Sequence, residues 1–363
     1  MPSAKFIVSS PVPESFRVNK IKGMFDCQFD EVKKEFDVSI PIENMPWNVG
    51  LIVGASGTGK TTIASRVFDG FNVFKGFEWN AASIVDDFPS NKTPKEITEI
   101  LSKVGFSSPP DWLKPFAVLS NGQKMRAELA RLILESDKPF IYDEFTSVVD
   151  RQVAQIGSAA IQKFVRKENK QFIAVSCHYD IAEWLEPDWV YDCNKMQFTD
   201  TRGSLRRPKI EIHVREAKQT EWSMFMDFHY LSSDHNNAAH KYIAEINGEP
   251  VAWCSVLHFP HPVTKNCKKM HRTVVKPDYQ GVGLGYFLRC EVAKRYQEKG
   301  FIVRTTLSSP ALINAMLKRK EWAMVRKPSR VGATSKAGVL SGSTSDSRLT
   351  ASFEFVGDKN GQT

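Results

Sequence analysis

The sequence predicts an α/β protein built from two domains. In each half of the 363-residue chain an apolar, strand-like run leads into a glycine loop and then into a stretch compatible with a helix, first over residues 51–68 and again over residues 270–299. The charge also divides the chain, because residues 1–200 sum to −4 and residues 201–363 to +12, which together give the net charge of +8. We therefore expect one domain over residues 1–200, a basic linker over 201–212, a second domain over 213–357 and a short tail over 358–363.

The first glycine loop runs from Gly54 to Thr61 and has the pattern Gly-x-x-x-x-Gly-Lys-Thr. Its glycines let successive backbone N–H groups turn toward a β-phosphate, while Lys60 reaches the β and γ oxygens and the Thr61 hydroxyl is placed to hold Mg²⁺. A plain glycine turn is the alternative, and the strand and helix on either side argue against it. The expected nucleotide-binding residues are Gly54, Ser56, Gly57, Gly59, Lys60, Thr61 and Thr62.

Four later segments complete a recognisable order. They are Leu119-Ser120-Asn121-Gly122-Gln123 at the start of a helical stretch, a buried strand over 139–142 that ends in Asp143-Glu144, the segment 145–150, and His178 after the strand 172–176. With the glycine loop, these segments resemble those of ABC-type ATPases. The resemblance implies an N-terminal P-loop NTPase domain in which residues 119–123 are the signature motif and residues 145–150 the D-loop.

The resemblance also implies roles for single residues. Thr61 and Asp143 would hold Mg²⁺, Glu144 would polarise the attacking water, and His178 would be the switch histidine. In the family, each ATP lies between the glycine loop of one protomer and the signature motif of another, so Ser120, Gly122 and Gln123 are expected to contact the partner's nucleotide. A chain with one copy of each motif is expected to form a homodimer through its ATPase domain.

Two departures from the family pattern matter. No glutamine occurs between Thr62 and Leu119, so the family's Q-loop residue is missing, and Asp86 or Asp87 is the candidate replacement at the metal. Asn121 replaces a glycine of the signature, a milder change because asparagine tolerates unusual backbone angles.

The sequence argues against a transporter subunit. It has no apolar run near the roughly 20 residues that span a bilayer and no signal peptide in its first ten residues. The segment between the glycine loop and the signature is short, which leaves little room for a subdomain that grips a membrane partner. Six cysteines without Cys-x-x-Cys spacing are typical of reduced thiols, so we expect a cytoplasmic protein.

The second glycine loop, residues 274–285, follows the predicted strands 251–259 and 270–275 and precedes a helix over 286–299 and a strand over 302–307. Taken alone, the loop is also compatible with a tight packing turn. In this order it resembles the GNAT acyltransferase fold, a mixed α/β domain, over about residues 213–357. The resemblance implies that backbone amides of Val282 to Tyr286 bind the pyrophosphate of acetyl-CoA or another acyl-CoA. The expected residues are Gln280, Gly281, Val282, Gly283 and Gly285, with Asn314 on the pantetheine arm.

An ABC-type ATPase joined to a GNAT domain is itself a recognisable prokaryotic architecture. Within GNAT proteins, residues 228–231 and 272–281 resemble the phage Mom-type branch, whose members modify adenine bases in DNA. That resemblance implies functional roles for His229, Tyr230 and Arg272.

These residues also have ordinary structural explanations. His229 is equally compatible with a satisfied core histidine, and Tyr230 with a half-buried aromatic. Six of the eight histidines fall within residues 229–271, which favours acid–base chemistry by a neutral imidazole. Metal binding is a rival explanation for that cluster, although spacings such as His229-x5-His235 match no standard ligand pattern.

The basic second half suits a polyanion. Candidate phosphate contacts are Arg202, Arg206, Arg207, Lys209, Lys265, Lys268, Lys269, Lys318, Arg319, Lys320, Arg326, Lys327 and Arg330, and candidate stacking platforms are Trp253 and Trp322. A solvated surface is the alternative for any one charge run. The Gly/Ser-rich residues 329–347 are expected to form a loop before a last strand over 350–355.

Together these features predict an ATP-gated acyltransferase that modifies a nucleic-acid base, with DNA favoured over RNA, using ATP, Mg²⁺ and acyl-CoA. Two alternatives stay open. One is an acetyltransferase for a protein or a small amine that is regulated by its ATPase domain, and the other is an ATP-dependent nucleic-acid clamp whose GNAT fold is only a scaffold.

Overall fold

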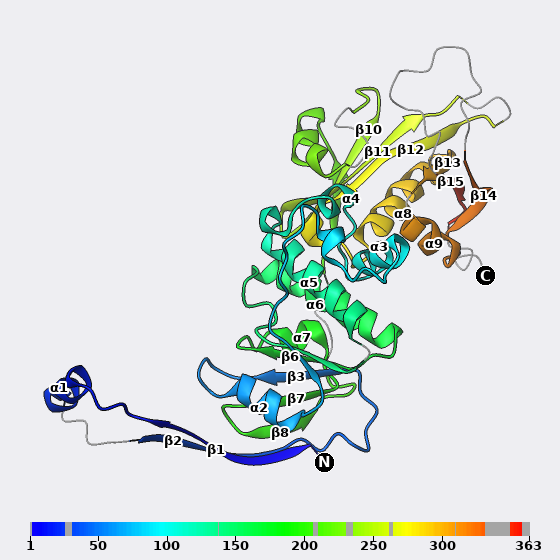
Figure 1. Cartoon of the computed structure of the whole chain (residues 1–363). Coiled ribbons are helices and arrows are strands. Elements are labelled where there is room, and N and C mark those ends of the chain that lie inside the picture. The colour runs from blue at the N-terminus through cyan, green and yellow to red at the C-terminus, as the bar shows by residue number, and fades with distance from the viewer. Residues whose placement is uncertain are drawn as a thin grey trace. The chain divides into compact units, whose positions relative to one another are not determined.

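A computed structural model describes residues 2–25, 31–136, 138–205, 210–229, 235–260, 264–308, 310–330 and 349–357. Its contacts divide the chain into two compact units (Figure 1). The first unit comprises residues 1–77, 135–150 and 161–208, and the second comprises 78–134, 151–160 and 209–363. The second unit therefore includes the signature motif as well as the region predicted to be an acyltransferase.

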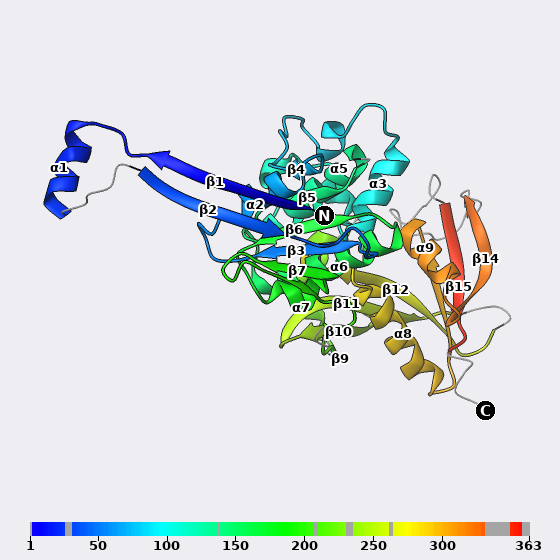
Figure 2. The ribbon, with the colours of Figure 1, turned by 90° about the horizontal axis from the view of Figure 1, so that it is seen from below.

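A six-stranded sheet forms the centre of the first unit (Figure 2). Its order is β4 (Asn72–Phe74), β5 (Phe140–Tyr142), β6 (Phe172–Ser176), β3 (Val49–Val53), β7 (Trp189–Asp192) and β8 (Gln197–Asp200). All neighbours are parallel except β7 and β8. Every residue of β3, β5 and β6 is buried, as expected for parallel strands covered on both faces. Helices α2 (Lys60–Val67) and α7 (Ile181–Leu185) follow β3 and β6.

An antiparallel ribbon joins β1 (Ser3–Pro11) to β2 (Glu31–Ser39). The inner end of the ribbon packs on the core, where Phe36 is 2% exposed and stacks on Phe6. Helix α1 (Phe16–Phe25) lies at the outer end (Figures 1 and 2) and has no buried residue.

Short helices form the first part of the second unit. They are η1 (Ile84–Asp87), α3 (Pro94–Lys103), α4 (Pro109–Trp112), η2 (Phe116–Val118), α5 (Asn121–Glu135) and the first ten residues of α6 (Arg151–Lys167). Helix α3 begins with a capping box between Thr93 and Glu96. The helix ends at Lys103, and Gly105, just beyond its cap, has a φ of +88°. The Phe106 N–H donates to the Leu101 carbonyl and the Gly105 N–H to the Ser102 carbonyl. This pairing is a Schellman motif, which favours glycine at that position.

The rest of the second unit is a seven-stranded sheet. Its order is β14 (Trp322–Arg330), β15 (Leu349–Phe355), β13 (Ile302–Leu307), β12 (Cys267–Val275), β11 (Glu249–His258), β10 (His240–Ile246) and β9 (His213–Glu216). Only β12 and β13 are parallel, and they pair only from Cys267–Ile302 to Met270–Thr305. Beyond that point neither strand pairs with the other, although β12 continues to Val275. The parallel pair is therefore open at the end where β12 enters the second glycine loop.

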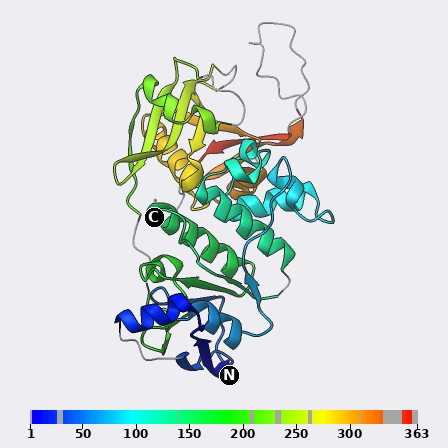
Figure 3. The same cartoon turned by 60° about the vertical axis from the view of Figure 1, so that its left-hand side comes forward.

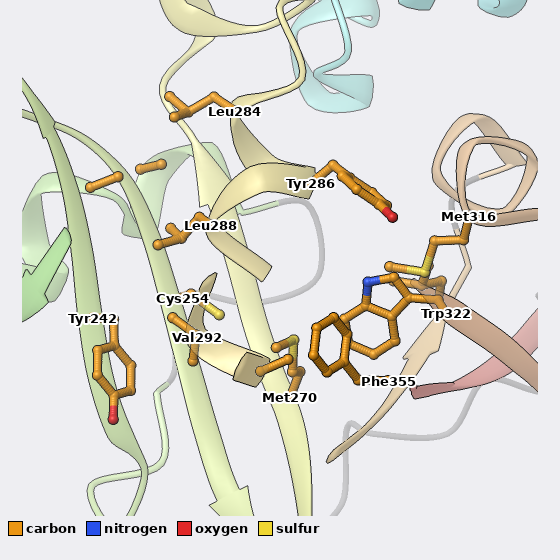
Figure 4. Close-up of a cluster of buried hydrophobic side chains, with 14 of the residues drawn as sticks. Tyr242, Cys254, Met270, Leu284, Tyr286, Leu288, Val292, Met316, Trp322 and Phe355 are labelled. Carbon is orange, nitrogen blue, oxygen red and sulfur yellow. The ribbon is translucent and has the colours of Figure 1, made fainter. Parts of the chain in front are cut away.

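Helix α8 (Leu284–Gln297) follows that loop, and α9 (Pro310–Leu317) follows β13. Buried residues of α8, such as Leu288 and Val292, pack with Met270, Trp322 and Phe355 in one hydrophobic core (Figure 4). The short helices η3 (Gln219–Met224) and η4 (Met226–Phe228) lie between β9 and β10, and η5 (Pro277–Tyr279) precedes the glycine loop. The expected strands and helices of this half are all present, with ends shifted by up to three residues.

Candidate nucleotide and acyl-transfer sites

The first glycine loop lies between β3 and α2 with a backbone suited to a phosphate. Gly57 and Gly59 have φ of +78° and +96°, a region that side chains rarely adopt. A Cβ on Gly59 would also lie 2.6 Å from the Phe36 ring, so β2 packs directly beneath the loop. The Lys60 ammonium donates to the Ala55 carbonyl at 2.9 Å, which places it across the mouth of the loop. Gly54 and Ser56 lie in this loop and Thr62 in the first turn of α2, and the backbone at the start of α2 is compatible with a phosphate there.

Thr61 and Asp143 are brought together from different elements. The Thr61 hydroxyl donates to Asp143 Oδ2 at 2.7 Å, although the two residues are 82 positions apart. A hydroxyl and a carboxylate are the hard oxygen ligands that Mg²⁺ prefers, so the pair fits the predicted metal role. Bound Mg²⁺ would neutralise charge on the phosphates.

Glu144 is held in an uncommon backbone conformation directly after β5. Its φ is +52°, its N–H donates to Asp143 Oδ1 at 2.9 Å, and its side chain is exposed. Positive φ in a residue other than glycine costs free energy and often occurs at functional sites. His178 follows β6, which is parallel to β5 and adjacent to it, so both residues lie at the same edge of the sheet. This placement is compatible with the roles predicted for both residues.

The signature motif begins α5. Ser120 caps the helix, because its hydroxyl accepts from the Gln123 N–H while the Gln123 side chain accepts from the Ser120 N–H. Ser120 and Asn121 are exposed, and Gly122 is buried. The Gln123 amide also donates to the Asp111 carboxylate at 2.9 Å, so this side chain is used to hold the motif in place.

The candidate replacements for the missing glutamine have local bonds of their own. The Asp87 carboxylate accepts the N–H groups of Asn80 and Ala81, and the Asp86 carboxylate accepts the Ser83 hydroxyl. Both residues belong to the second unit, whereas Thr61 and Asp143 belong to the first. A metal contact by either aspartate stays a prediction.

The second glycine loop ends in an open helix N-terminus. Gly283 has φ of +92°, precedes the first turn of the 14-residue helix α8, and a Cβ there would meet no atom within 4 Å. The space beside Gly283 at the start of α8 is therefore open, which is compatible with an anion at this helix N-terminus. A Cβ on Gly285 would lie 3.1 Å from Val275, so glycine allows α8 to approach β12. Val282 is half-buried between these glycines.

Gln280 and Gly281 form the structural end of the loop. The Gln280 side chain accepts from the Ser107 N–H at 2.6 Å and donates to the Val275 carbonyl at 3.0 Å. Its amide is thus committed to protein contacts. Asn314 is exposed on α9 between the buried residues Ile313 and Met316, and its predicted contact with the pantetheine arm stays a prediction.

His229 and Arg272 meet although 43 positions separate them. The Arg272 guanidinium lies 2.6 Å from His229 Nδ1 and stands over the Trp222 ring. Because a guanidinium can only donate, this contact requires a lone pair on the imidazole and therefore its neutral form. Tyr230 lies outside the described residues.

The tryptophans do not form exposed stacking platforms, so that prediction is wrong. Trp253 is 0% exposed and Trp322 is 3% exposed, since both indoles belong to hydrophobic cores. Trp253 instead packs against Trp222 and the ring of His235. Burial, followed by the neighbouring His271, lowers the pKa of His235 to about 4, so this imidazole is neutral near pH 7.

No cluster of three or more histidine, cysteine, aspartate or glutamate side chains able to hold a metal ion occurs among the described residues. In the same part of the chain, no helix is both long enough and apolar enough to cross a membrane.

Several of the candidate phosphate contacts are engaged within the protein. Lys268 stands over the rings of Tyr296 and Phe301, and Lys269 stands over Phe259. Burial lowers the pKa of Lys269. Other engaged groups are Arg202 with Asp200, Arg319 over Tyr286, and Arg326 with Thr350. Arg206, Arg207, Lys209 and the loop 331–348 lie outside the described residues.

The fold and its sequence similarities indicate a mixed α/β enzyme in which a P-loop ATPase region is joined to an acyltransferase domain. Residues 179–316 match the sequence profile described as the acetyltransferase (GNAT) family. The energy-coupling factor transporter ATP-binding protein EcfA1 of Staphylococcus aureus is 26% identical over 210 residues, which cover 47% of this chain and 76% of that protein. The lactococcin-G-processing and transport ATP-binding protein LagD of Lactococcus lactis subsp. lactis is 22% identical over 222 residues, covering 48% and 31%.

Solved structures resemble both parts. The ATP-binding cassette MJ0796, in a dimeric post-hydrolysis state with ADP and Pi, is 13% identical, with coverage of 55% of this chain and 100% of that chain and a TM-score of 0.39. A Bacillus subtilis acetyltransferase in complex with CoA is 13% identical, with coverage of 40% and 98% and a TM-score of 0.31. With scores this low, the assignment depends on the sequence matches and the sheet topology. The chain combines an ABC-type ATPase region with a GNAT acetyltransferase domain, and the predicted fold class is confirmed.

Proposed function

We propose that this protein uses acyl-CoA to acylate an amine of a nucleic-acid base, DNA in particular, and that ATP binding gates the reaction. The observation that carries the acid–base part is the 2.6 Å contact between Arg272 and His229 Nδ1. The contact requires a neutral imidazole, and the substrate would have to displace Arg272 from the Nδ1 lone pair before that atom accepts a proton from the attacking amine. Arg272 belongs to β12, the strand that leads into the second glycine loop.

In the proposed reaction the base amine attacks the thioester carbonyl. A C–N bond forms, the proton of the amine passes to His229, and the C–S bond breaks as the coenzyme A thiolate leaves and is protonated. Tyr230 is the proposed acid for that thiolate. The N–H groups after Gly283, where the space is open, would bind the pyrophosphate, and backbone N–H groups near the loop would stabilise the oxyanion.

We further propose that the protein is cytoplasmic and forms a homodimer through its ATPase regions. The glycine loop of one protomer and Ser120 of another would enclose each ATP, with Mg²⁺ at Thr61 and Asp143. Glu144 would polarise the attacking water, and His178 would contact the γ-phosphate. Closure of this dimer would hold the substrate until hydrolysis.

A second candidate function is acetylation of a protein or a small amine. It is favoured by the engagement of Lys268 and Lys269 with aromatic rings, because this reduces the cations free to follow a phosphate backbone. The two candidates differ in their product, a modified nucleoside or an acetylated protein or small amine.

Mass spectrometry of nucleosides from cells with and without the protein distinguishes them. A new modified nucleoside supports the first function, and a new acetyl-lysine without one supports the second. With purified protein, His229→Ala should lower the transfer rate by about 10²- to 10⁴-fold at unchanged CoA affinity. His258→Ala is the matched control, because His258 is exposed at the end of β11. Transfer at the normal rate by His229→Ala would make that histidine a packing residue.

CoA binding has its own test. Gly283→Trp should abolish it by filling the space before α8. Gly248→Trp is the control, because Gly248 also has positive φ, at +79°, and open space around it, but lies in the turn between β10 and β11. Equal loss of CoA binding in both variants would show that strain, and not occlusion of the loop, is responsible.

A further inference from the structure

The stretch Pro277–Gly281, here called the docking turn, is seated on the ATPase side of the second unit. It links β12 to the second glycine loop, and all of its contacts described below lie within this one unit. Figure 3 shows the cyan and teal helices of residues 78–134 beside the yellow start of α8. The docking turn contacts the signature helix α5, the loop after α3 and the first turns of α6. The residues that contact it, Gly105, Ser107, Gly122, Arg126 and Gln152, are here called its seat.

Arg126 of the signature helix holds the docking turn by its backbone. The side chain is 1% exposed, and its guanidinium donates to the carbonyls of Pro277 and Asp278 at 2.7 Å each. The carboxylate of Asp278 is 3.9 Å away. Burial, opposed by Asp278, lowers the pKa of Arg126 to about 10. Burial of the Arg126 charge costs desolvation free energy, and its two charge-assisted hydrogen bonds to the docking turn offset that cost.

The signature motif itself contacts the docking turn. A Cβ on Gly122 would lie 2.7 Å from Asp278 Oδ1 and 2.8 Å from Val153. Gly122 is the second residue of α5, one position from the exposed Asn121 and two from the capping residue Ser120. Gly122 therefore belongs both to the signature turn, which is expected to contact the γ-phosphate, and to the seat of the docking turn.

The loop after α3 closes the other side of the seat. A Cβ on Gly105 would lie 2.9 Å from the Gln280 carbonyl oxygen and 3.0 Å from Gly281 Cα. The Ser107 N–H donates to the Gln280 side chain at 2.6 Å. Backbone is thus packed directly on backbone, so a shift of one side would require the other to rearrange.

The third contact involves the segment after the D-loop. The Tyr279 hydroxyl lies within hydrogen-bonding distance of the Gln152 side chain in the first turn of α6, and 2.8 Å from Glu249. Tyr279 is 5% exposed. Two ATPase motifs expected at a dimer interface, the signature and the D-loop, are each followed within a turn by a contact to the docking turn.

We propose that this seat couples the two ligand sites, so that ATP bound at residues 120–123 and acyl-CoA bound at residues 280–285 change each other's affinity. The inference rests on the proposed function, because it requires both ligands. Displacement of the signature turn moves Gly122 and Arg126, and these contact Pro277 and Asp278 directly. Coupling of binding free energies is reciprocal, so each ligand changes the affinity for the other by the same factor.

Calorimetry on the full chain tests the coupling. The dissociation constant of coenzyme A is measured without nucleotide and with saturating ATP and Mg²⁺, in the Glu144→Gln chain so that ATP persists. The expected ratio of the two constants is at least about 5, in either direction. A ratio of 1 with intact CoA binding overturns the coupling and leaves the acyltransferase proposal standing. Absence of CoA binding in both states overturns the acyltransferase proposal, and the coupling with it.

A matched pair of glycines tests the route. Gly105 and Gly300 both follow the end of a helix in a Schellman motif, with φ of +88° and +80°, but a Cβ on Gly300 would meet no atom within 4 Å. Gly105→Ala should bring the ratio close to 1, and Gly300→Ala should leave it unchanged. Retention of the ratio by Gly105→Ala, or its loss in both variants, overturns the route through the docking turn.

A second pair serves if Gly105→Ala does not fold. Tyr279→Phe removes one hydroxyl from the seat, whereas Tyr296→Phe removes one from the hydrogen bond with Tyr242 inside the GNAT core. The ratio should move at least twofold toward 1 in Tyr279→Phe alone. An equal ratio in both variants argues against the seat.

Discussion

Arg126→Met gives a quantitative test of how the buried guanidinium stabilises the second unit. The substitution removes two charge-assisted hydrogen bonds, to the carbonyls of Pro277 and Asp278. Bonds of this kind contribute about 1.5–3 kcal/mol each, so their loss alone would cost about 3–6 kcal/mol. Methionine, however, also removes the charge. Burial lowers the pKa of Arg126 to about 10, so methionine relieves a desolvation cost of about 3 kcal/mol.

The net loss expected for Arg126→Met is therefore no more than about 3 kcal/mol. Arg126→Lys should be at least as destabilising, although it appears more conservative. A lysine ammonium keeps the buried charge, is more strongly hydrated than a guanidinium, and cannot reproduce a fork that reaches two carbonyls. It forfeits about 1.5–3 kcal/mol of hydrogen bonding without any relief.

Hydrogen exchange measured by mass spectrometry is the suitable assay, because it gives local free energies in a protein of two units. The peptides to follow are 119–134 and 276–284. Arg295→Met is the control, because Arg295 donates to the Val214 carbonyl at the other end of α8 and is 34% exposed. If Arg126→Met lowers the local free energy of unfolding by more than about 5 kcal/mol, or if Arg126→Lys exchanges as wild type does, the hydrogen bonds and the desolvation cost do not offset each other in this way.

Three further predictions address other parts of the molecule. Glu144→Gln should bind ATP without hydrolysing it and elute as a dimer in size-exclusion chromatography with ATP and Mg²⁺, and a monomeric variant would contradict the proposed ATP-sandwich dimer. Gly50→Ala should destabilise the first unit by about 3 kcal/mol, seen as faster exchange in β3 and β7, because the new Cβ would lie 2.1 Å from the fully buried Trp189 ring. Because the pKa of His235 is lowered in the fold, its contribution to stability is complete above about pH 6.5 and is lost as pH falls toward 4, by up to about 3 kcal/mol. His235→Leu should flatten this part of the pH–stability curve measured by urea unfolding, whereas a curve unchanged from wild type would show that another group causes the acid loss.

The motifs that act through contiguous residues could be predicted from the sequence. Both glycine loops lie between a strand and a helix as expected, because their function depends on local backbone conformation. The contact between Thr61 and Asp143 also follows from the sequence, since parallel strands place their carboxyl ends at one edge. The positive φ of Glu144 was not predicted, because no residue type there requires it.

Contacts formed at long range could not be predicted in the same way. Arg126 lies in a basic helical stretch that reads as a solvated face, and only its packing on a turn 151 residues later buries it. The burial of Trp253, in contrast, could have been predicted from the sequence. Residues 251–256 form a continuous apolar run apart from Ser255, which is typical of a strand buried on both faces and leaves no exposed side for stacking.

The course of the chain through the two units limits how the protein can be divided. It passes from one unit to the other five times, after residues 77, 134, 150, 160 and 208. A single cut near residue 208 would leave Arg126 on one fragment and the carbonyls of Pro277 and Asp278 on the other, so the N-terminal piece would expose a buried cation and the C-terminal piece an unsupported glycine loop. A transplant of the acyltransferase half into another chain would therefore need a host that supplies an arginine and two glycines at the positions of Arg126, Gly122 and Gly105. The acyltransferase half is in this sense not modular, because its glycine loop depends on residues that precede it in the chain by more than 150 positions.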